Sequence, residues 1–383
     1  MQNRKDQLDW IQALRGIAVL LVVLTHTRLY FMGMPQWPQV NDLLMSGAIG
    51  VDLFFIISGF IMVHTTAGQT GPKAALLFGI KRFVRIWPPY AVVLLCWLGL
   101  AMGGMSFFRQ PGSTGVFLKS LALLPVDLGH PPFFGLLFPL AWTLMFEMYF
   151  YLVFGLSMLL GRWRWLGLAA WMGSTLVLLP RLHGMAGFEV MVPNPYPGYL
   201  NLMVNPIIYE FLFGVLIGLL YRQPWARIPH TTLTWQLLLV STGYALWYPF
   251  SHPGILHGPL QWGGALAPMV LVMALASKTV AFNPPRWLVW TGTVSYSMYL
   301  THYLGQLALT RWGQANSIDT HTWAQVFLTV LCAFPLAWLA HLCLERGLGE
   351  WTRRALMRLF ARWLSAPDTG VRTTPDGNAV RIA

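Results

Sequence analysis

The sequence predicts an all-α, polytopic integral membrane protein of about ten transmembrane helices. Of its 383 residues, 56% are hydrophobic, only 10% are charged and 19 are Trp. A water-soluble core of this size would not need so few charges, whereas the interior of a bilayer makes charges rare. The apolar residues also gather into long runs that short connections separate. Composition and pattern therefore both indicate a chain that crosses a membrane repeatedly.

Ten apolar runs give the predicted spans. In chain order they cover about 10–32, 47–63, 89–105, 133–160, 165–179, 200–221, 237–250, 263–276, 287–309 and 323–344. A straight crossing takes roughly 20 residues, so several runs are short, and a miscount by one around 237–276 stays open. The first run is too long for the apolar part of a signal peptide and carries two ionisable residues, so we expect it to stay in the mature protein.

Basic residues predict how these spans are oriented. Most of the 25 Lys and Arg residues fall in alternate connections, beginning with Arg4 and Lys5 and ending with the arginines from Arg346 onward. Because Lys and Arg accumulate on the cytoplasmic side, both termini are predicted to be cytoplasmic. The formal net charge of +12 is spread over many short loops, so it indicates membrane orientation and lipid attraction, not nucleic-acid binding.

One transmembrane domain, residues 1–347, makes up most of the chain. After it, Trp351, Leu359 and Trp363 recur at roughly helical spacing among arginines, which predicts a basic amphipathic helix on the inner leaflet over 348–364. Residues 365–383 are polar and rich in Pro, Gly and Thr, so a disordered cytoplasmic tail is predicted there. The three cysteines lack metal-ligand spacing, and no metal site is predicted.

The strongest functional signal is the pair Arg15 and His26 on the first apolar run. A central arginine in a span costs roughly 2.5–3.5 kcal/mol, so two ionisable residues in one helix indicate a buried working site. Their separation is close to three helical turns, which puts both side chains on nearly the same face, on the order of 16 Å apart along the axis. That face presents a fixed cation toward one end of the membrane and a titratable imidazole toward the other.

Asp52, in the second apolar run, is predicted at a depth comparable with that of His26. A carboxylate there can bond one imidazole nitrogen, fix the tautomer and leave the other nitrogen as a base, so we predict that Asp52 pairs with His26. The alternative is an interfacial aspartate that faces water. Ser58 and Gly59, further along the run, are interpreted as a close-packing point between helices in preference to a nucleophile.

A basic cluster of Lys81, Arg82 and Arg85 is followed by Pro88 and Pro89. The cluster is predicted where an inner loop becomes a span, with the prolines at the start of the helix. Three cations within five residues could hold a phosphorylated ligand that arrives from the cytosol. Anchoring by the positive-inside rule alone would also place basic residues here, so both interpretations stay open.

Other polar residues are predicted at mid-membrane depth. Glu147 lies in the fourth apolar run with Tyr151 on the same face four residues on. A buried carboxylate protonates or seeks a cation, so a salt bridge to Arg15 and a catalytic role are both open. For Glu210 a structural role and a catalytic role are likewise open, and the structural role is preferred. His302 is either a packing residue or a substrate contact.

In this order and topology the motifs resemble those of the membrane acyltransferase-3 family, of the polysaccharide O-acetyltransferase type. Members O-acylate exopolysaccharides, lipopolysaccharide O-antigens, Nod factors and macrolides. The resemblance covers about 8–347 and rests on five motifs. They are Arg15-x10-His26, Gly50-Val-Asp-x-Phe-Phe-x-x-Ser-Gly-Phe60, Arg82-x-x-Arg85 with Pro88, Trp142-Thr-Leu with Glu147, and Ser295-Tyr-Ser-Met-Tyr-Leu-Thr-His302.

The resemblance implies a multi-pass enzyme of the bacterial inner membrane. It would move an acetyl or similar acyl group from cytosolic acetyl-CoA or another acyl-CoA to a hydroxyl of a surface polysaccharide, exopolysaccharide or lipid-linked oligosaccharide, with membrane lipids as its surroundings. His26 is similar to the family's essential histidine and is expected to be the general base. The full set of candidates is His26, Asp52 and Glu147 for catalysis, Arg15, Lys81, Arg82 and Arg85 for the donor, and Tyr151 and His302 for the substrate.

Two other functions fit a polytopic chain. A transporter or flippase would use buried Arg15, Glu147 and His302 for the passage of an ion or substrate. Such a protein is expected to have repeated halves with helices broken by Gly or Pro, which the sequence does not show. A polymerase for envelope glycans usually has a large outer loop with catalytic arginines, and the predicted outer loops are short. Direct transfer and transfer through an acyl-histidine are both open.

Overall fold

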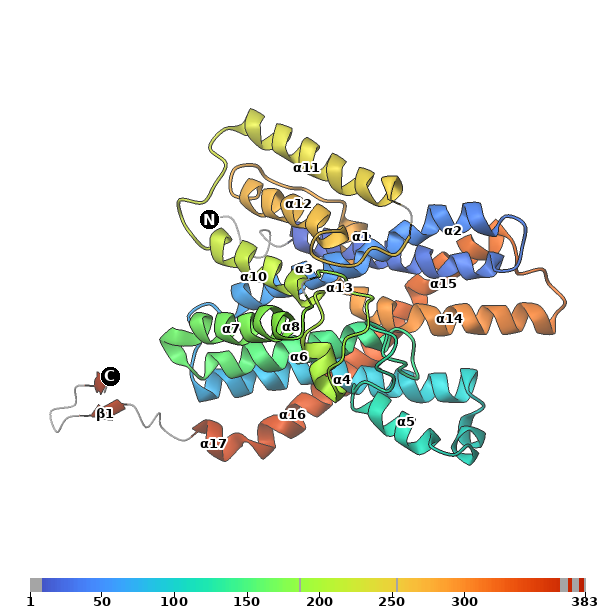
Figure 1. Cartoon of the computed structure of the whole chain (residues 1–383), viewed down its shortest axis with the longest axis horizontal. Coiled ribbons are helices and arrows are strands. Elements are labelled where there is room, and N and C mark those ends of the chain that lie inside the picture. Colours follow the sequence, from blue (N-terminus) through green and yellow to red (C-terminus); the bar gives the residue numbers. More distant parts are fainter. Residues whose placement is uncertain (1–8, 186, 253, 366–370, 374–378, 382–383) are drawn as a thin grey trace.

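The computed structural model describes residues 9–185, 187–252, 254–365, 371–373 and 379–381. Over these residues the chain is helical apart from two short strands, β1 (Val371–Thr373) and β2 (Ala379–Arg381), which pair antiparallel (Figure 1). Six helices in the described ranges are long and apolar enough to cross a membrane. The chain is therefore a multi-pass membrane protein, while the predicted count of ten spans and the side of each terminus stay predictions.

The helices of the described residues follow one another without a large inserted loop. The α-helices are α1 (Asp9–Thr27), α2 (Trp37–Met45), α3 (Ile49–Thr65), α4 (Pro72–Ala101), α5 (Ser113–Leu121), α6 (Ala141–Met158), α7 (Arg164–Gly173), α8 (Leu179–Leu182), α9 (Gly198–Met203), α10 (Ile208–Tyr221), α11 (Thr231–Ser251), α12 (Trp262–Ala276), α13 (Arg286–Thr293), α14 (Ser295–Ala315), α15 (Trp323–Ala340), α16 (Gly349–Leu359) and α17 (Ala361–Ser365). Short 3-10 segments are η2 (Arg28–Phe31), η3 (Ser46–Ala48), η4 (Gly104–Arg109) and η5 (Gly161–Trp163), and π-helical segments are η6 (Ser174–Leu178) and η7 (His341–Leu348).

The largest difference from the predicted elements concerns α4. Pro88 and Pro89 lie inside this helix, so the prediction that they start a helix is wrong. Pro72 occupies the first turn instead, where the missing N–H has no helical partner to lose. Pro88 and Pro89 are buried against other helices, a setting in which membrane helices tolerate proline. The basic cluster at 81–85 therefore lies on a helix within the bundle and not in a loop.

Two predicted runs are each split into two helices. The run 200–221 becomes α9 and α10, separated around Pro206, which has no N–H to continue the helix. The run 287–309 becomes α13 and α14, with the break at Val294. The short helices α2 and α5 were not predicted, because neither has an apolar run long enough to stand out.

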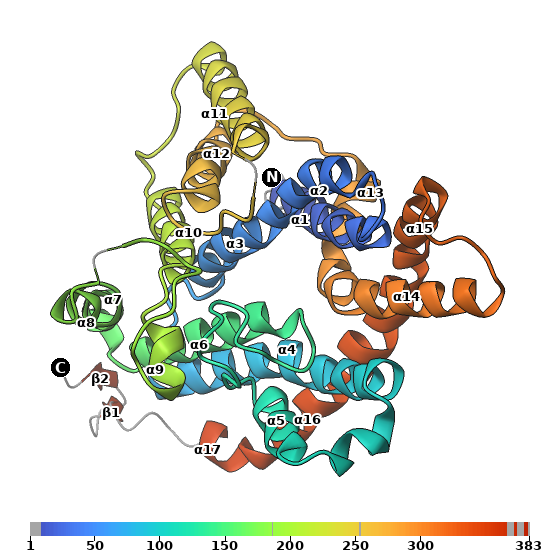
Figure 2. The ribbon, with the colours of Figure 1, turned by 45° about the vertical axis from the view of Figure 1, so that its right-hand side comes forward.

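Close packing of α3 against α10 holds the centre of the bundle together (Figure 2). A Cβ atom on Gly59 would lie 2.1 Å from the carbonyl oxygen of Phe211, and one on Gly214 would lie 1.9 Å from that of Ile56. Only glycine permits such an approach, because small residues let membrane helices come together. The interpretation of Gly59 as a close-packing point is confirmed.

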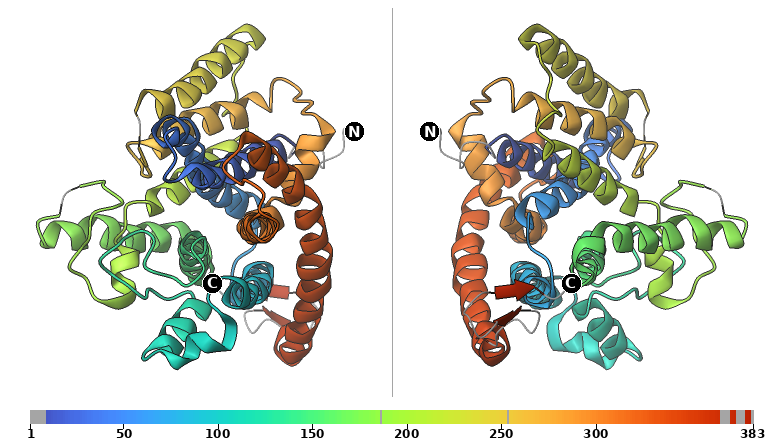
Figure 3. Two further views of the ribbon diagram at one scale, coloured as in Figure 1. Left: turned by 90° about the vertical axis from the view of Figure 1, so that its right-hand side faces the viewer. Right: turned by 90° about the vertical axis from the view of Figure 1, so that its left-hand side faces the viewer.

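The C-terminal helices continue from the last span. α15, η7 and α16 form one helical stretch from Trp323 to Leu359, which runs along the side of the bundle (Figure 3). The predicted helix over 348–364 thus corresponds to α16 and α17, and its place on the inner leaflet stays a prediction. Of the predicted disordered tail, 366–370, 374–378 and 382–383 lie outside the described residues. The described parts include β1 and β2, and a disordered tail stays a prediction.

Candidate active site

A cavity lies among α1, α3, α4, α6 and α14, the helices that carry most of the sequence motifs. The empty space among these helices is about 660 Å³, part of which is open to the solvent. Six residues singled out in the sequence line it together: Arg15, Ser58, Arg82, Arg85, Glu147 and Tyr151. Lys81 does not line the cavity, and its side chain is exposed.

Three arginines give the cavity its charge. Arg15 is only 8% exposed and donates a hydrogen bond of 2.9 Å to Gln12 Oε1. The guanidinium of Arg82 lies over the ring of Tyr151, 5.1 Å from its centre, and donates to Thr65 Oγ1 at 3.2 Å. Within the described ranges, none of Arg15, Arg82 and Arg85 forms an ion pair with a carboxylate. Arginine that is not paired in this way is free to bind an anionic ligand.

Glu147 and Tyr151 lie on one face of α6, as predicted. The Tyr151 hydroxyl donates to Glu147 Oε1, and the Ser58 hydroxyl lies 3.3 Å from the same oxygen and 3.2 Å from the Tyr151 oxygen. Glu147 makes no direct salt bridge to Arg15, although its charge acts on Arg15 together with that of Glu345. Glu147 is thus a hydrogen-bonded carboxylate that lines the cavity, and its catalytic role stays a prediction.

Tyr299 and Thr143 mark the end of the cavity that lies nearest His26. Their hydroxyl oxygens are 2.7 Å apart, and both residues line the cavity. The Tyr299 ring centre is 6.1 Å from that of His302 on the next turn of α14. Tyr299 therefore separates the arginine-lined space from the histidines. Its role was not foreseen, although Tyr299 lies within the motif from Ser295 to His302.

His26 and His302 face each other across α1 and α14. His302 Nε2 lies 3.3 Å from His26 Nδ1, and the ring centres are 5.1 Å apart. His26 Nδ1 is also 2.8 Å from the carbonyl oxygen of Val22, and His302 Nδ1 is 3.0 Å from that of Met298. A carbonyl oxygen only accepts hydrogen bonds, so both histidines carry their proton on Nδ1. This leaves the Nε2 lone pair of His26 available as a base.

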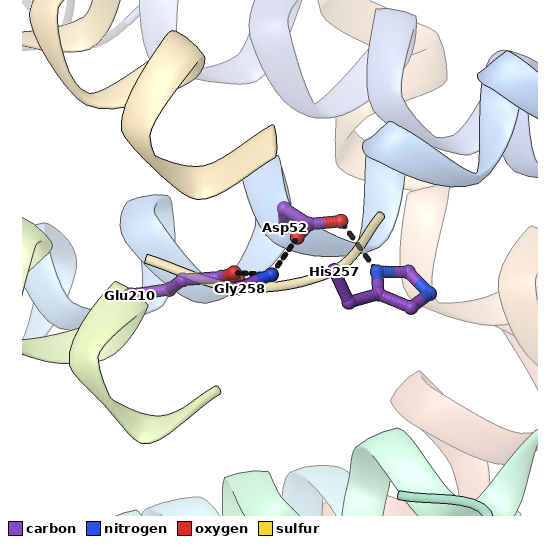
Figure 4. A network of polar contacts seen from close by, with 4 residues as sticks. All are labelled: Asp52, Glu210, His257 and Gly258. Atoms are coloured by element: carbon purple, nitrogen blue, oxygen red, sulfur yellow. Dashed lines mark hydrogen bonds and ion pairs between the residues drawn. The ribbon is translucent and has the colours of Figure 1, made fainter. Parts of the chain in front are cut away.

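The predicted pairing of His26 with Asp52 is wrong. Asp52 is fully buried, and its Oδ2 lies 2.7 Å from Nδ1 of His257, in the connection between α11 and α12 (Figure 4). The backbone N–H of Gly258 donates to Glu210 Oε1 at 3.0 Å and lies 3.4 Å from Asp52 Oδ1. Two buried carboxylates thus hold one loop, which agrees with the structural role preferred for Glu210. His257 was missed because a lone histidine in a connecting loop has neither periodicity nor a motif.

No cluster of three or more His, Cys, Asp and Glu side chains that could hold a metal ion occurs in the part of the chain that the structure describes. The site consists of an arginine-lined cavity at one end of α1, α4 and α14, followed along α1 and α14 by a pair of histidines. Such an arrangement suits an anionic ligand whose reactive end reaches a base.

Comparison with known proteins agrees with this chemistry. The sequence profile described as an acyltransferase domain matches residues 8–342. The exopolysaccharide production protein ExoZ of Rhizobium meliloti is 30% identical over 313 residues, which cover 79% of this chain and 89% of ExoZ. BcsY of Komagataeibacter xylinus is 27% identical over 322 residues, 79% of this chain and 73% of BcsY.

A third relative is longer than this chain. The peptidoglycan O-acetyltransferase OatA of Listeria monocytogenes is 22% identical over 327 residues, 76% of this chain but only 48% of OatA. No solved structure matches the chain significantly. Because the family profile covers nearly the whole sequence, the protein belongs to the acyltransferase domain family and is a membrane-spanning acyltransferase.

Proposed function

We propose that the protein is an O-acyltransferase of the bacterial inner membrane that moves an acetyl or similar acyl group from cytosolic acyl-CoA to a hydroxyl of a surface polysaccharide or exopolysaccharide sugar. One observation carries this proposal: a single cavity gathers Arg15, Arg82 and Arg85 and ends at Tyr299, beside His302 and His26. The names of ExoZ and OatA, which refer to exopolysaccharide production and to O-acetyl transfer on peptidoglycan, support a glycan acceptor.

The three arginines are proposed to bind the donor. Acyl-CoA carries several phosphate charges, and guanidinium groups recognise phosphate oxygens through paired, charge-assisted hydrogen bonds. The phosphates would meet Arg82 and Arg85, with the acyl end extending past Arg15 toward Tyr299. The predicted cytoplasmic position of this end of α4 agrees with a donor that is made in the cytosol.

His26 is proposed to activate the acceptor. Its Nδ1 proton is held by Val22 and shared with His302, so its Nε2 can take the proton of a sugar hydroxyl. The oxygen then attacks the thioester carbonyl carbon, and the carbon–sulfur bond breaks. The acyl group stays on the sugar oxygen, coenzyme A leaves as a thiolate, and the proton on His26 passes to that sulfur. Atoms and charges balance without a further reactant.

Asp52 takes no part in this step, because its carboxylate is engaged by His257. Glu147 is proposed to act on the donor side, where its hydrogen bonds to Tyr151 and Ser58 orient the wall that faces the arginines. A direct transfer to the sugar needs no acyl-enzyme. Rapid quenching with radiolabelled acetyl-CoA should therefore leave the protein unlabelled at early times, and label on His26 would favour the covalent route.

Mass analysis of the host's surface polysaccharide tests the proposal directly. Without the protein, each repeat unit should lose the fixed mass of one acyl group, and the wild-type chain should restore it. A His26→Ala chain, present at the same level in the membrane, should not restore this mass. An unchanged polysaccharide mass in the absence of the protein would overturn the proposed function.

A further inference from the structure

A second group of side chains surrounds His26 on the side away from the arginine cavity. The same three helices supply both groups in the same order. On α1 Arg15 comes before His26, on α4 Arg85 comes before Trp97, and on α14 Tyr299 comes before Tyr303. Trp97 and Tyr303 do not line the arginine cavity. These later turns therefore lie outside that cavity, beside the proposed base.

An aromatic platform forms one part of this surface. The rings of Tyr303 and Trp97 are stacked, with centres 5.3 Å apart and planes 17° apart. The ring of His26 meets Tyr303 edge to face at 5.3 Å. Stacked aromatic side chains with polar edges offer apolar surface against which a sugar ring can pack while its hydroxyls bond elsewhere. A ring on this platform would bring a hydroxyl close to His26.

Two buried polar atoms near the platform lack partners within the described part of the chain. They are Nε1 of Trp97, a residue 9% exposed, and Oε1 of Gln306, a residue 6% exposed. Gln306 Nε2 donates to the backbone oxygen of His26 at 3.0 Å, which fixes the orientation of the amide and places its oxygen near His26. Buried groups without a partner are costly and call for an explanation. A hydroxyl-bearing ligand would supply an acceptor for Trp97 and a donor for Gln306.

Arg28 adds a positive charge at the same place. Its guanidinium bonds only neutral oxygens, the Thr25 carbonyl at 2.5 Å and Asn41 Oδ1 at 3.3 Å. No described carboxylate pairs with it, and its charge acts on both His26 and Tyr303. The predicted topology puts Arg28 at the outer end of the first span, where basic residues are scarce. An arginine kept there without a counter-ion indicates an anionic ligand.

We infer that Trp97, Tyr303, Gln306 and Arg28 form the acceptor subsite, and that it takes a sugar residue bearing a carboxylate, such as a hexuronic acid. The inference rests on the proposed function, because it assigns the acceptor of the same reaction. The sugar ring packs against the stack of Tyr303 and Trp97, its carboxylate pairs with Arg28, and one of its hydroxyls meets Nε2 of His26. The subsite thereby selects acidic glycans over neutral ones.

Binding of two disaccharides that differ in one carboxylate tests this inference. Cellobiouronic acid and cellobiose are titrated into the purified full chain in a neutral detergent, with calorimetry as the readout. Wild type should bind the acid about tenfold more tightly. Arg28→Gln should abolish that preference, whereas Arg109→Gln, which removes an exposed arginine elsewhere, should keep it. Tyr303→Leu should weaken both sugars roughly three- to tenfold, and Tyr303→Phe should bind as wild type does.

Several outcomes would overturn the subsite. These are equal affinity for the two sugars, no binding of either, or a preference that survives Arg28→Gln. Loss of acid binding on addition of phosphatidylglycerol would assign Arg28 to a lipid headgroup and would also overturn it. An acetyl-CoA transfer assay separates the two proposals. If the enzyme acetylates both sugars equally and Arg28→Gln has no effect on transfer, the proposed function holds and the subsite is refuted. If the protein binds the acidic sugar selectively but transfers no acetyl group, the subsite holds and the proposed function is refuted.

Discussion

His26 holds its ring proton on Nδ1, because that nitrogen lies 2.8 Å from a carbonyl oxygen four residues earlier in its own helix. The helix backbone thus performs the orienting role that sequence reasoning gave to Asp52. His302 shares the same proton and is itself oriented by the Met298 carbonyl. A neutral imidazole oriented in this way needs no carboxylate to act as a base.

Removal of the proposed base gives the first prediction. His26→Ala should lower the rate of acyl transfer by about 10²- to 10⁴-fold, the usual contribution of a general base. The affinity for acetyl-CoA should change little, because His26 does not line the arginine cavity. Turnover and equilibrium binding of acetyl-CoA, measured on the same detergent preparation, check both parts. Wild-type turnover in His26→Ala would remove His26 from the mechanism.

Two cations on α4 provide a matched test of donor binding. Arg85 lines the cavity, whereas Lys81 is exposed one turn away on the same helix. Arg85→Gln should weaken acetyl-CoA binding about tenfold or more, since a charge-assisted hydrogen bond to phosphate is lost. Lys81→Gln should stay within about twofold of wild type at moderate salt. Equal losses in the two variants would indicate a diffuse surface effect and not a cavity that binds the donor.

Among the helices, α3 and α10 depend on glycine for their contact. Gly214→Ala places a methyl group 1.9 Å from the Ile56 carbonyl oxygen, so unfolding in mixed micelles should become easier by roughly 1–3 kcal/mol. Gly79→Ala is the control, because nothing lies within 4 Å of that position on α4. It should be neutral or stabilising by up to about 1 kcal/mol. Similar stability of the two variants would argue against the close contact.

The loop between α11 and α12 depends on Asp52 and His257. In a double-mutant cycle on unfolding free energy, Asp52→Ala and His257→Ala should couple by about 0.5–3 kcal/mol, because each leaves the other buried without its partner. Asp52→Ala and His26→Ala should be additive within about 0.5 kcal/mol. A strong coupling of Asp52 with His26, and none with His257, would restore the arrangement predicted from the sequence.

Helix positions were largely predictable, because each of the ten apolar runs overlaps a helix. The ends of the helices were less predictable than their positions. Pro88 and Pro89 suggested a helix start, yet packing on all sides keeps them inside α4. The break at Val294 has no Pro beside it, and a single glycine, Gly292, does not by itself indicate the end of a helix. The helices α2 and α5 are too short for periodicity to reveal. Local sequence therefore identifies the apolar core of a span, while tertiary contacts decide where the helix begins and ends.

Over the whole molecule, the sequence identified those site residues that carry a local signal, such as a charge within an apolar run. A buried charge in a span is costly, so Arg15 and Glu147 stood out, and the arginine density of α4 did as well. These residues converge on one cavity. His257, Trp97 and Gln306 were missed, because their importance comes from partners far away in the sequence. No spacing rule brings a loop histidine to Asp52 or a tryptophan of α4 to Tyr303.

In the proposed mechanism, the donor and the acceptor reach one enzyme from opposite ends of the same helices. Proteoliposomes with acetyl-CoA sealed inside and an acceptor saccharide outside test this arrangement, with protein-free vesicles and His26→Ala as controls. We predict acetylated saccharide in the outer solution from the wild-type protein and none from either control. Product that forms only when acetyl-CoA and the saccharide are supplied on the same side would rule out this mechanism.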